Sequence, residues 1–159
     1  MLKPDSLRAT LEAALPDLAR NPDRLLVFID EGTVRCTAAE SLSWEYGYTL
    51  RVVVTDYAQH ADTLVLPVLR WVAKHQPELL SNPDRQKTGI RFEADLLNKS
   101  SMDLAILLTL TERVVVRDNP DAPGLLAHHV PEPPLDPYDY VESWSLTIRH
   151  PDGTHEAVV

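Results

Sequence analysis

The chain opens with apolar residues at three- and four-residue spacing, which predicts an amphipathic helix. These residues are Leu7, Leu11, Ala14, Leu15 and Leu18. Pro4 and Asp5 suit the first helical turn, and Pro16 is expected to bend or end the helix. A second helical stripe follows in LVLPVLRWVAKHQ, where Pro67 fits only near the first turn. Its apolar members are Leu64, Val65, Val68, Leu69 and Val72.

Period-two alternation dominates the stretch between these helices and predicts β-strands. SWEYGYTLRVVVT alternates over its full length, so it should form a long strand with one buried face. The apolar side of this strand is formed by Trp44, Tyr46, Tyr48, Leu50, Val52 and Val54. Upstream, LLVFID and TVRCTA are separated by Glu31 and Gly32, a two-residue link that predicts a β-hairpin.

The second half of the chain shows three further strand patterns. GIRFEADLL alternates, and MDLAILLTLTERVVV is apolar on both faces in its middle, as in a central strand. Residues 144–149 alternate again before a turn at His150–Gly153. Helix, strands, helix and strands with short connections favour an antiparallel sheet. We therefore predict an α+β fold in one domain, residues 1–159: a two-layer sandwich of a mainly antiparallel sheet with two helices on one face.

The tripeptide Asn-Pro-Asp occurs at residues 21–23, 82–84 and 119–121. The first two copies belong to the similar stretches PDLARNPDR and PELLSNPDR, each between a helical and a strand pattern. A duplicated αββ unit is therefore conceivable. The third copy follows a strand pattern instead. Because Asn tolerates cap and turn geometry and Pro presets φ, local turn chemistry is the favoured interpretation.

Six of the chain's 13 prolines lie between Asn119 and Tyr140. This density predicts a long proline-rich loop, since proline fits neither a helix interior nor a central strand. The segment is nevertheless more apolar than a disordered loop usually is. We predict an arm, residues 119–140, that contacts a neighbouring subunit or another partner. Its candidate contact residues are Leu125, Leu126, Val130, Pro131, Glu132, Pro133, Pro134, Leu135, Tyr138 and Tyr140.

Composition excludes several classes of function. A formal net charge of −9 and a pI near 5.0 argue against a protein that grips nucleic-acid phosphates. The single cysteine, Cys36, excludes an intrachain disulfide and fits a reducing compartment. The N-terminal MLKPDSLRATLEAAL lacks the apolar region of a signal peptide, and no apolar run is long enough to cross a membrane.

No set of residues has the spacing of a catalytic, cofactor-binding or metal site, so we predict neither an enzyme nor a cofactor. Asp30 and Glu31 are expected at a solvated hairpin tip, where nothing desolvates a carboxylate. The six histidines lack ligand spacing, and the five glycines are scattered singly. The aromatic residues of the long strand flank an acidic residue and are expected in the core. Trp71 lies off the helical stripe, which leaves it free to face a partner.

Several of these stretches together resemble one protein family. LLVFIDEG, SLSWEYGYTLRVVVTDY, the helix with WVAKHQPELL, and GIRFEADLLN followed by LTERVVV are similar to the tail completion protein R (GpR) family of contractile-tailed temperate phages. The similarity runs from about Leu2 to Val116 and extends into VPEPPLDPY. It implies a structural virion protein that completes the phage tail and carries no catalytic residues.

By fold-level analogy with tail-terminator proteins, the resemblance also implies a homo-oligomeric ring at the head-proximal end of the tail tube, expected to be a hexamer. The implied partners are tail tube, sheath and head–tail connector proteins. DNA would pass through the acidic ring without specific binding, and no membrane is involved. The implied location is the host cytoplasm during assembly and the virion tail or neck afterwards. The alternative is a small soluble prophage-encoded binding or inhibitor module without a tail role, which the oligomeric state would distinguish.

Overall fold

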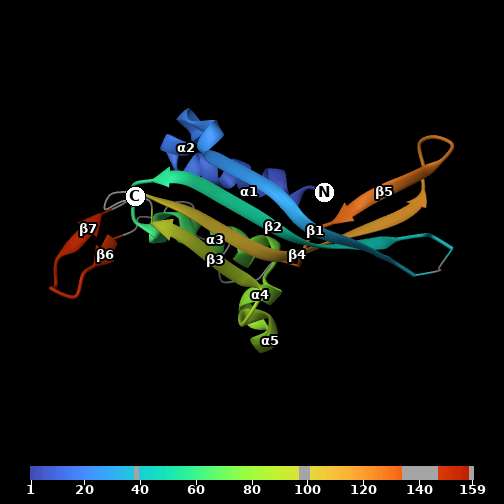
Figure 1. Ribbon diagram of the computed structural model, residues 1–159. Coiled ribbons are helices and arrows are strands. Elements are labelled where there is room, and N and C mark those ends of the chain that lie inside the picture. The colour runs from blue at the N-terminus through green and yellow to red at the C-terminus, as the bar shows by residue number, and fades with distance from the viewer. Residues whose placement is uncertain (38–39, 97–100, 134–146, 158–159) are drawn as a thin grey trace.

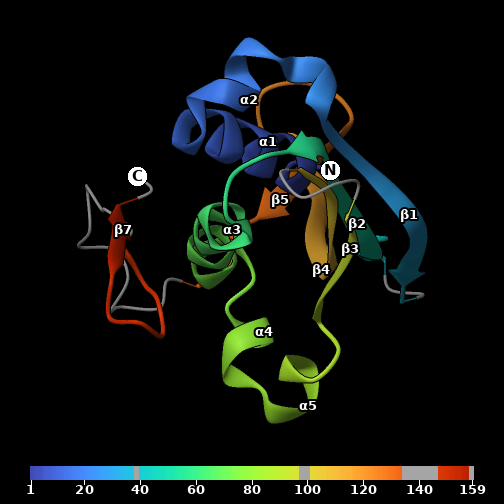
Figure 2. The ribbon, with the colours of Figure 1, turned by 60° about the vertical axis from the view of Figure 1, so that its left-hand side comes forward.

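The computed structural model describes residues 1–37, 40–96, 101–133 and 147–157. It has the predicted α+β architecture, in which one antiparallel sheet carries helices on a single face (Figure 1). Helices α1 (Lys3–Ala14) and α3 (Ala61–His75) lie on the same side of this sheet, as Figure 2 shows. No helical layer covers the other face among the described residues.

Short helices connect the two layers. Helix α2 (Pro16–Arg20) and the 3₁₀ turn η1 (Pro22–Arg24) lead from α1 into the first strand. Helices α4 (Glu78–Ser81) and α5 (Pro83–Gln86) lead from α3 into the third. The predicted break at Pro16 is confirmed, because α1 ends two residues earlier and Pro16 starts α2.

The main sheet contains five strands. They are β1 (Leu25–Cys36), β2 (Trp44–Tyr57), β3 (Ile90–Leu96), β4 (Met102–Asp118) and β5 (Leu125–Val130). Strands β1, β2, β4 and β3 follow one another in that order, all neighbours are antiparallel, and β5 pairs with the far end of β4. The predicted central position of β4 is confirmed.

The C-terminal strand predicted from alternation does not join this sheet. Strand β6 (Thr147–Arg149) pairs with β7 (His155–Ala157) in a separate two-stranded sheet. The predicted turn at His150–Gly153 connects the two strands, and the Gly153 N–H donates to the His150 carbonyl at 2.9 Å. The first residues of the predicted strand, 144–146, lie outside the described residues.

The alternation of the long strand determines the core, as predicted. On β2, the side chains of Tyr48, Leu50, Val52 and Val54 are buried. They pack with Leu104, Ile106, Leu108 and Leu110 of β4 and with apolar residues of both long helices. The residues of α1 and α3 in this core include Leu7, Leu11, Leu64, Val68, Trp71 and Val72. Burying these side chains between the layers supplies the main driving force of folding.

The predicted hairpin at Glu31 and Gly32 is wrong. Strand β1 continues through both residues and pairs with β2 from Leu25 to Cys36. Its register shifts only between Ile29 and Glu31, where a bulge accommodates one extra residue. Gly32 is not among the residues with positive φ, so the two-residue turn that its sequence suggested does not form.

Trp71 is buried and does not face a partner, contrary to the interpretation from the helical stripe. Its indole N–H donates to Oγ of Ser6 at 3.0 Å, and its ring stacks on His75 with centroids 4.8 Å apart. Because Ser6 belongs to α1, this side chain joins the two long helices. Pro67 is also buried and lies in the second turn of α3, not near its first turn.

The three Asn-Pro-Asp tripeptides all form local turns, as turn chemistry predicts. Oδ1 of Asn82 accepts the N–H of Asp84, and Oδ1 of Asn119 accepts the N–H of Asp121, each at 3.0 Å. The first copy leads into η1. The alternative of a duplicated unit also has a counterpart in the fold, because α1-β1-β2 and α3-β3-β4 place their strands symmetrically about the β2–β4 pair.

Gly89 and Gly32 provide a matched test of this fold. A Cβ at Gly89 would lie 2.6 Å from Cδ2 of Leu79 and 2.7 Å from the Arg85 carbonyl oxygen. Gly89→Ala should therefore lower the free energy of unfolding by about 1–3 kcal/mol, measured by urea denaturation. At Gly32 the nearest atom is 3.7 Å away, so Gly32→Ala should change stability by only about 0.5 kcal/mol. A large loss at Gly32 would contradict the uninterrupted β1.

Candidate interaction surface

Part of the predicted proline-rich arm, residues 119–140, forms a strand. Leu125–Val130 form β5, which pairs antiparallel with Arg113–Asp118 of β4. The expectation of a loop from residue 119 to 140 is therefore wrong for this part. No proline lies between Pro123 and Pro131, so every residue of β5 keeps the N–H group that a ladder needs.

The candidate contact residues divide into a tip and a base. At the tip, Leu125 is 68% exposed and Leu126 is 42% exposed. At the base, Val130 and Glu132 are half-buried, while Pro131 and Pro133 are exposed. The four remaining candidates lie outside the described residues; they are Pro134, Leu135, Tyr138 and Tyr140.

Two hairpins project at one end of the molecule. Figure 1 shows the β4–β5 hairpin and the end of the β1–β2 hairpin extending beyond α1 and α3 in the same direction. On the β1–β2 hairpin, Val34 is 65% and Leu42 is 60% exposed. We call Val34, Leu42, Leu125 and Leu126 the hairpin-end residues. Exposed apolar side chains gathered at one end are typical of a surface that contacts another protein.

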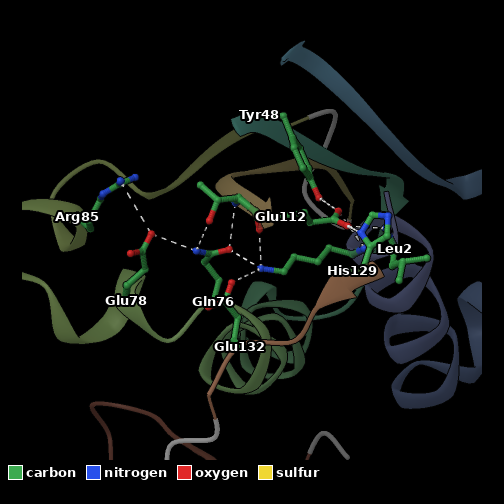
Figure 3. Close-up of polar contacts among 10 residues, drawn as sticks. Leu2, Tyr48, Gln76, Glu78, Arg85, Glu112, His129 and Glu132 are labelled. Carbon is green, nitrogen blue, oxygen red and sulfur yellow. Dashed lines mark hydrogen bonds and ion pairs between the residues drawn. The ribbon is translucent and has the colours of Figure 1, made fainter. Parts of the chain in front are cut away.

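A buried carboxylate holds the base of the β4–β5 hairpin (Figure 3). Glu112 of β4 is 5% exposed. Its Oε2 accepts the N–H of Leu2 at 2.8 Å, its Oε1 accepts the N–H of Lys3 at 3.3 Å, and the Tyr48 hydroxyl donates to Oε1. Glu112 thus satisfies N–H groups at the start of α1, where a negative charge also interacts favourably with the helix dipole.

The surroundings of Glu112 favour its charged form. Burial by itself raises the pKa of this carboxyl, but the hydrogen bonds from Tyr48, Leu2 and Lys3 and the charged N-terminus together hold its pKa below the ordinary value. Burial and the neighbouring carboxylate raise the pKa of the Tyr48 phenol far above its ordinary value. Tyr48 therefore remains a proton donor at neutral pH.

Two side-chain contacts, one to β4 and one to the N-terminal residues, lie at the base of β5. Nδ1 of His129 lies 3.2 Å from Oε2 of Glu112, close enough for an ion pair when the imidazole is protonated but without hydrogen-bond alignment. Just beyond β5, Oε1 of Glu132 accepts from Nζ of Lys3 at 3.0 Å. Residues 129–132 therefore lie on the body of the protein, and the free part of the hairpin is its tip.

Gln76 fills a gap along one side of β4. Strand β3 pairs with β4 as far as Leu108, and β5 pairs with it from Arg113. Between them, the Thr111 N–H donates to Oε1 of Gln76 and Nε2 of Gln76 donates to Oγ1 of Thr111, both at 3.1 Å. Nζ of Lys3 donates to the Thr111 carbonyl at 2.7 Å. The side chains of Gln76 and Lys3 thus form the hydrogen bonds with Thr111 that a neighbouring strand would otherwise form.

Sequence reasoning missed Glu112 and Gln76 as anchoring residues. For Glu112 a signal exists, because period two from Leu104 through Leu110 places it on the buried face of β4. A carboxylate on such a face requires partners, since burying an unpaired charge is costly. No sequence pattern indicates the role of Gln76, because it follows the last turn of α3 and its partner Thr111 is 35 residues away.

Asp30 and Glu31, predicted at a hairpin tip, lie within β1 instead. Oδ2 of Asp30 accepts from Nε of Arg51 at 2.7 Å, and Nη1 of Arg51 donates to Oε2 of Glu93 at 2.9 Å. Arg51 thereby links β1, β2 and β3 across the uncovered face of the sheet. These partly exposed ion pairs contribute little stability individually.

The side chains of the described residues do not assemble a metal site. No group of three or more His, Cys, Asp or Glu residues could hold a metal ion in this part of the chain. Within the same residues, no helix is long and apolar enough to cross a membrane. The structure presents free sheet edges, projecting hairpins and a polar anchor behind them. These features are typical of proteins that work through contacts with other proteins.

Comparison with known proteins identifies the family. Residues 1–133 match the family model described as P2 phage tail completion protein R (GpR). The tail completion protein R of Escherichia phage P2 is 46% identical over 134 residues, which cover 84% of this chain and 85% of that protein. The chain therefore belongs to the P2 phage tail completion protein R family, as its sequence pattern indicated. This is a family of structural tail proteins and not of enzymes. No solved structure matches the chain.

Glu112→Gln should destabilise the protein by roughly 3 kcal/mol at pH 7, because the buried N–H groups of Leu2 and Lys3 lose their charged acceptor. The folded-state pKa of Glu112 is lowered, so its contribution is present above about pH 4.5 and is lost as the pH falls through the folded value. The difference between wild type and variant should accordingly shrink below pH 4.5.

Urea unfolding between pH 3 and 8 measures this difference. Glu93→Gln is the matched control, because the Glu93 side chain is 62% exposed and its ion pair with Arg51 is a surface contact. If Glu112→Gln is as stable as the wild type at pH 7, or if the difference does not depend on pH, Glu112 is not the charged anchor described above.

Proposed function

We propose that this chain completes a phage tail as one subunit of a ring, with a hexamer as the expected state, at the head-proximal end of the tail tube. The observation that carries this proposal is the family match over residues 1–133. The ring and its position go beyond that match. They are supported by the free edges of the sheet, β1 on one side and β3 on the other, which suit lateral contact between copies.

The acidity of the chain is compatible with a ring around DNA. Each copy has a formal net charge of −9, so a ring of copies repels the phosphate backbone and does not hold it. The DNA would then pass through without specific binding. In this proposal the protein partners are the tail tube and sheath on one side and head–tail connector proteins on the other.

The hairpin-end residues form the contact with the tail tube in this proposal. The edges of β1 and β3 face sideways, whereas the two hairpins extend along the strand direction. Lateral neighbours in a ring meet at edges, so the projecting ends remain for a component stacked above or below. Val34, Leu42, Leu125 and Leu126 provide apolar surface there. The segment 134–140 remains a candidate part of this contact.

Native mass spectrometry tests the ring. The wild-type protein, alone or bound to purified tails, should give the mass of a closed ring, and electron micrographs of such tails should show it at one end. Tails assembled without the protein are the control. A protein that stays monomeric in solution and on tails excludes the ring and favours a binding or inhibitor module.

Leu125→Ser combined with Leu126→Ser tests the hairpin end. Both side chains are exposed, so the fold and the ring should persist, while binding to tails should weaken by at least tenfold because apolar burial at the contact is lost. Leu26→Ser is the matched control, since Leu26 is 45% exposed but lies on β1 away from the hairpin tips. Co-sedimentation with tails measures binding. Unchanged binding by the double variant would show that the hairpin end is an ordinary solvent-exposed surface.

A further inference from the structure

Strand β3 continues the core face of the sheet beyond the helices that cover it. Directly paired residues of neighbouring antiparallel strands share a face, so Val52, Ile106 and Phe92 form one row on the core face. Ile106 is 2% exposed, whereas Phe92 is 73% exposed and Leu96 is 79% exposed. Large apolar side chains on an edge strand, in line with the core, indicate a surface that another chain covers.

The free backbone groups of β3 lie beside these side chains. The Thr109 N–H donates to the Gly89 carbonyl at 2.9 Å, and hydrogen-bonded pairs alternate with non-hydrogen-bonded pairs along an antiparallel ladder. The core-face residues Phe92, Ala94 and Leu96 therefore direct their N–H and C=O groups away from β4. Among the described residues, β3 has no second partner strand to receive them.

Strand β1, at the opposite edge of the sheet, also has backbone N–H and C=O groups that point away from its neighbour. The Leu25 carbonyl accepts from Nη1 of Arg8 at 3.0 Å, so it faces away from β2. By the same alternation, the outward backbone groups of β1 belong to core-face residues such as Val27 and Ile29. The outward residues of both edge strands thus carry their side chains on the same face of the sheet.

The directions of β1 and β3 also suit antiparallel pairing between copies. Strands β1, β2, β4 and β3 alternate in direction, so β1 and β3 run in opposite directions. If all copies have the same orientation, as in a ring, β3 of one copy meets β1 of the next antiparallel, and core face joins core face. Both matches arise because the path from one edge to the other, β1-β2-β4-β3, contains an even number of strands. Pairing of β3 with β3 would instead need a two-fold axis and would close after two copies.

We propose that β3 of each copy pairs with β1 of the next copy, so that a continuous antiparallel sheet closes the ring. This inference rests on the ring proposed above and identifies its contact surface. On the uncovered face both edge strands carry charges of both signs: Glu31 and Arg35 on β1, and Arg91, Glu93 and Asp95 on β3. The partner is a second copy of this chain.

Ala94→Pro tests the pairing. Proline removes the outward N–H of Ala94 and leaves the ladder between β3 and β4 intact, so the monomer should fold with a urea midpoint close to that of the wild type. Assembly should weaken by at least tenfold, measured by native mass spectrometry. Glu93→Pro is the matched control, because it removes an N–H that points to β4 and should lower the urea midpoint. Phe92→Ser keeps the backbone unchanged and should also weaken assembly.

Cysteine pairs identify the partner strand. In a Cys36→Ser background, Ala94→Cys combined with Ile29→Cys or Val27→Cys should give a ladder of cross-linked copies up to the ring on a non-reducing gel. Ala94→Cys alone should give no cross-link; a cross-linked dimer would mean that β3 pairs with β3, which overturns the proposal. Intact rings of Ala94→Pro without any ladder also overturn it and leave the ring itself standing. A monomer in solution and on tails overturns both.

Discussion

The hydrogen bonding of β4 is the constraint on which the rest of the structure depends. This strand has 17 residues and a buried middle, so its N–H and C=O groups need partners on both sides. Strand β2 serves one side. The other side is served in turn by β3, by the side chains of Gln76 and Lys3 at Thr111, and by β5. The end of α3, the N-terminus and the β4–β5 hairpin are all positioned by this one strand.

Glu112 adds a charged centre to that arrangement. It joins the start of α1, the core tyrosine of β2 and the imidazole of β5 at one carboxylate. A buried carboxylate is tolerated there because the hydrogen bonds from Leu2, Lys3 and Tyr48 stabilise its charged form and together offset the cost of desolvation. The base of the projecting hairpin is thereby attached to the helical layer as well as to the sheet. The tip can present Leu125 and Leu126 because its base is held in this way.

The sequence allowed the fold class, the long helices and the two central strands to be predicted, because each depends on hydrophobic periodicity within one segment. The errors concern features that depend on contacts between segments. Glu31-Gly32 has the composition of a hairpin turn, but pairing with β2 keeps β1 extended and adds a bulge. Prolines at 120, 123 and 131 suggested a loop, yet the proline-free residues between them pair with β4, whose far end passes beyond β3. Gln76 could not be recognised locally, because its role depends on a gap between two strands distant in sequence.

The exposed surfaces likewise depend on contacts between segments that are distant in the sequence. Alternation in GIRFEADLL predicts an apolar side on β3, and such a pattern by itself predicts that this side is buried in the core. Only the arrangement of the helices shows that the row ending at Phe92 extends past the covered part of the sheet. A monomer can keep such a strand in water because β3 is only seven residues long and its other face is charged. The net charge of −9 further opposes unselective contact between copies. An edge of this kind favours a partner strand that matches its direction and its face, and β1 of a second copy is the partner proposed on those two grounds.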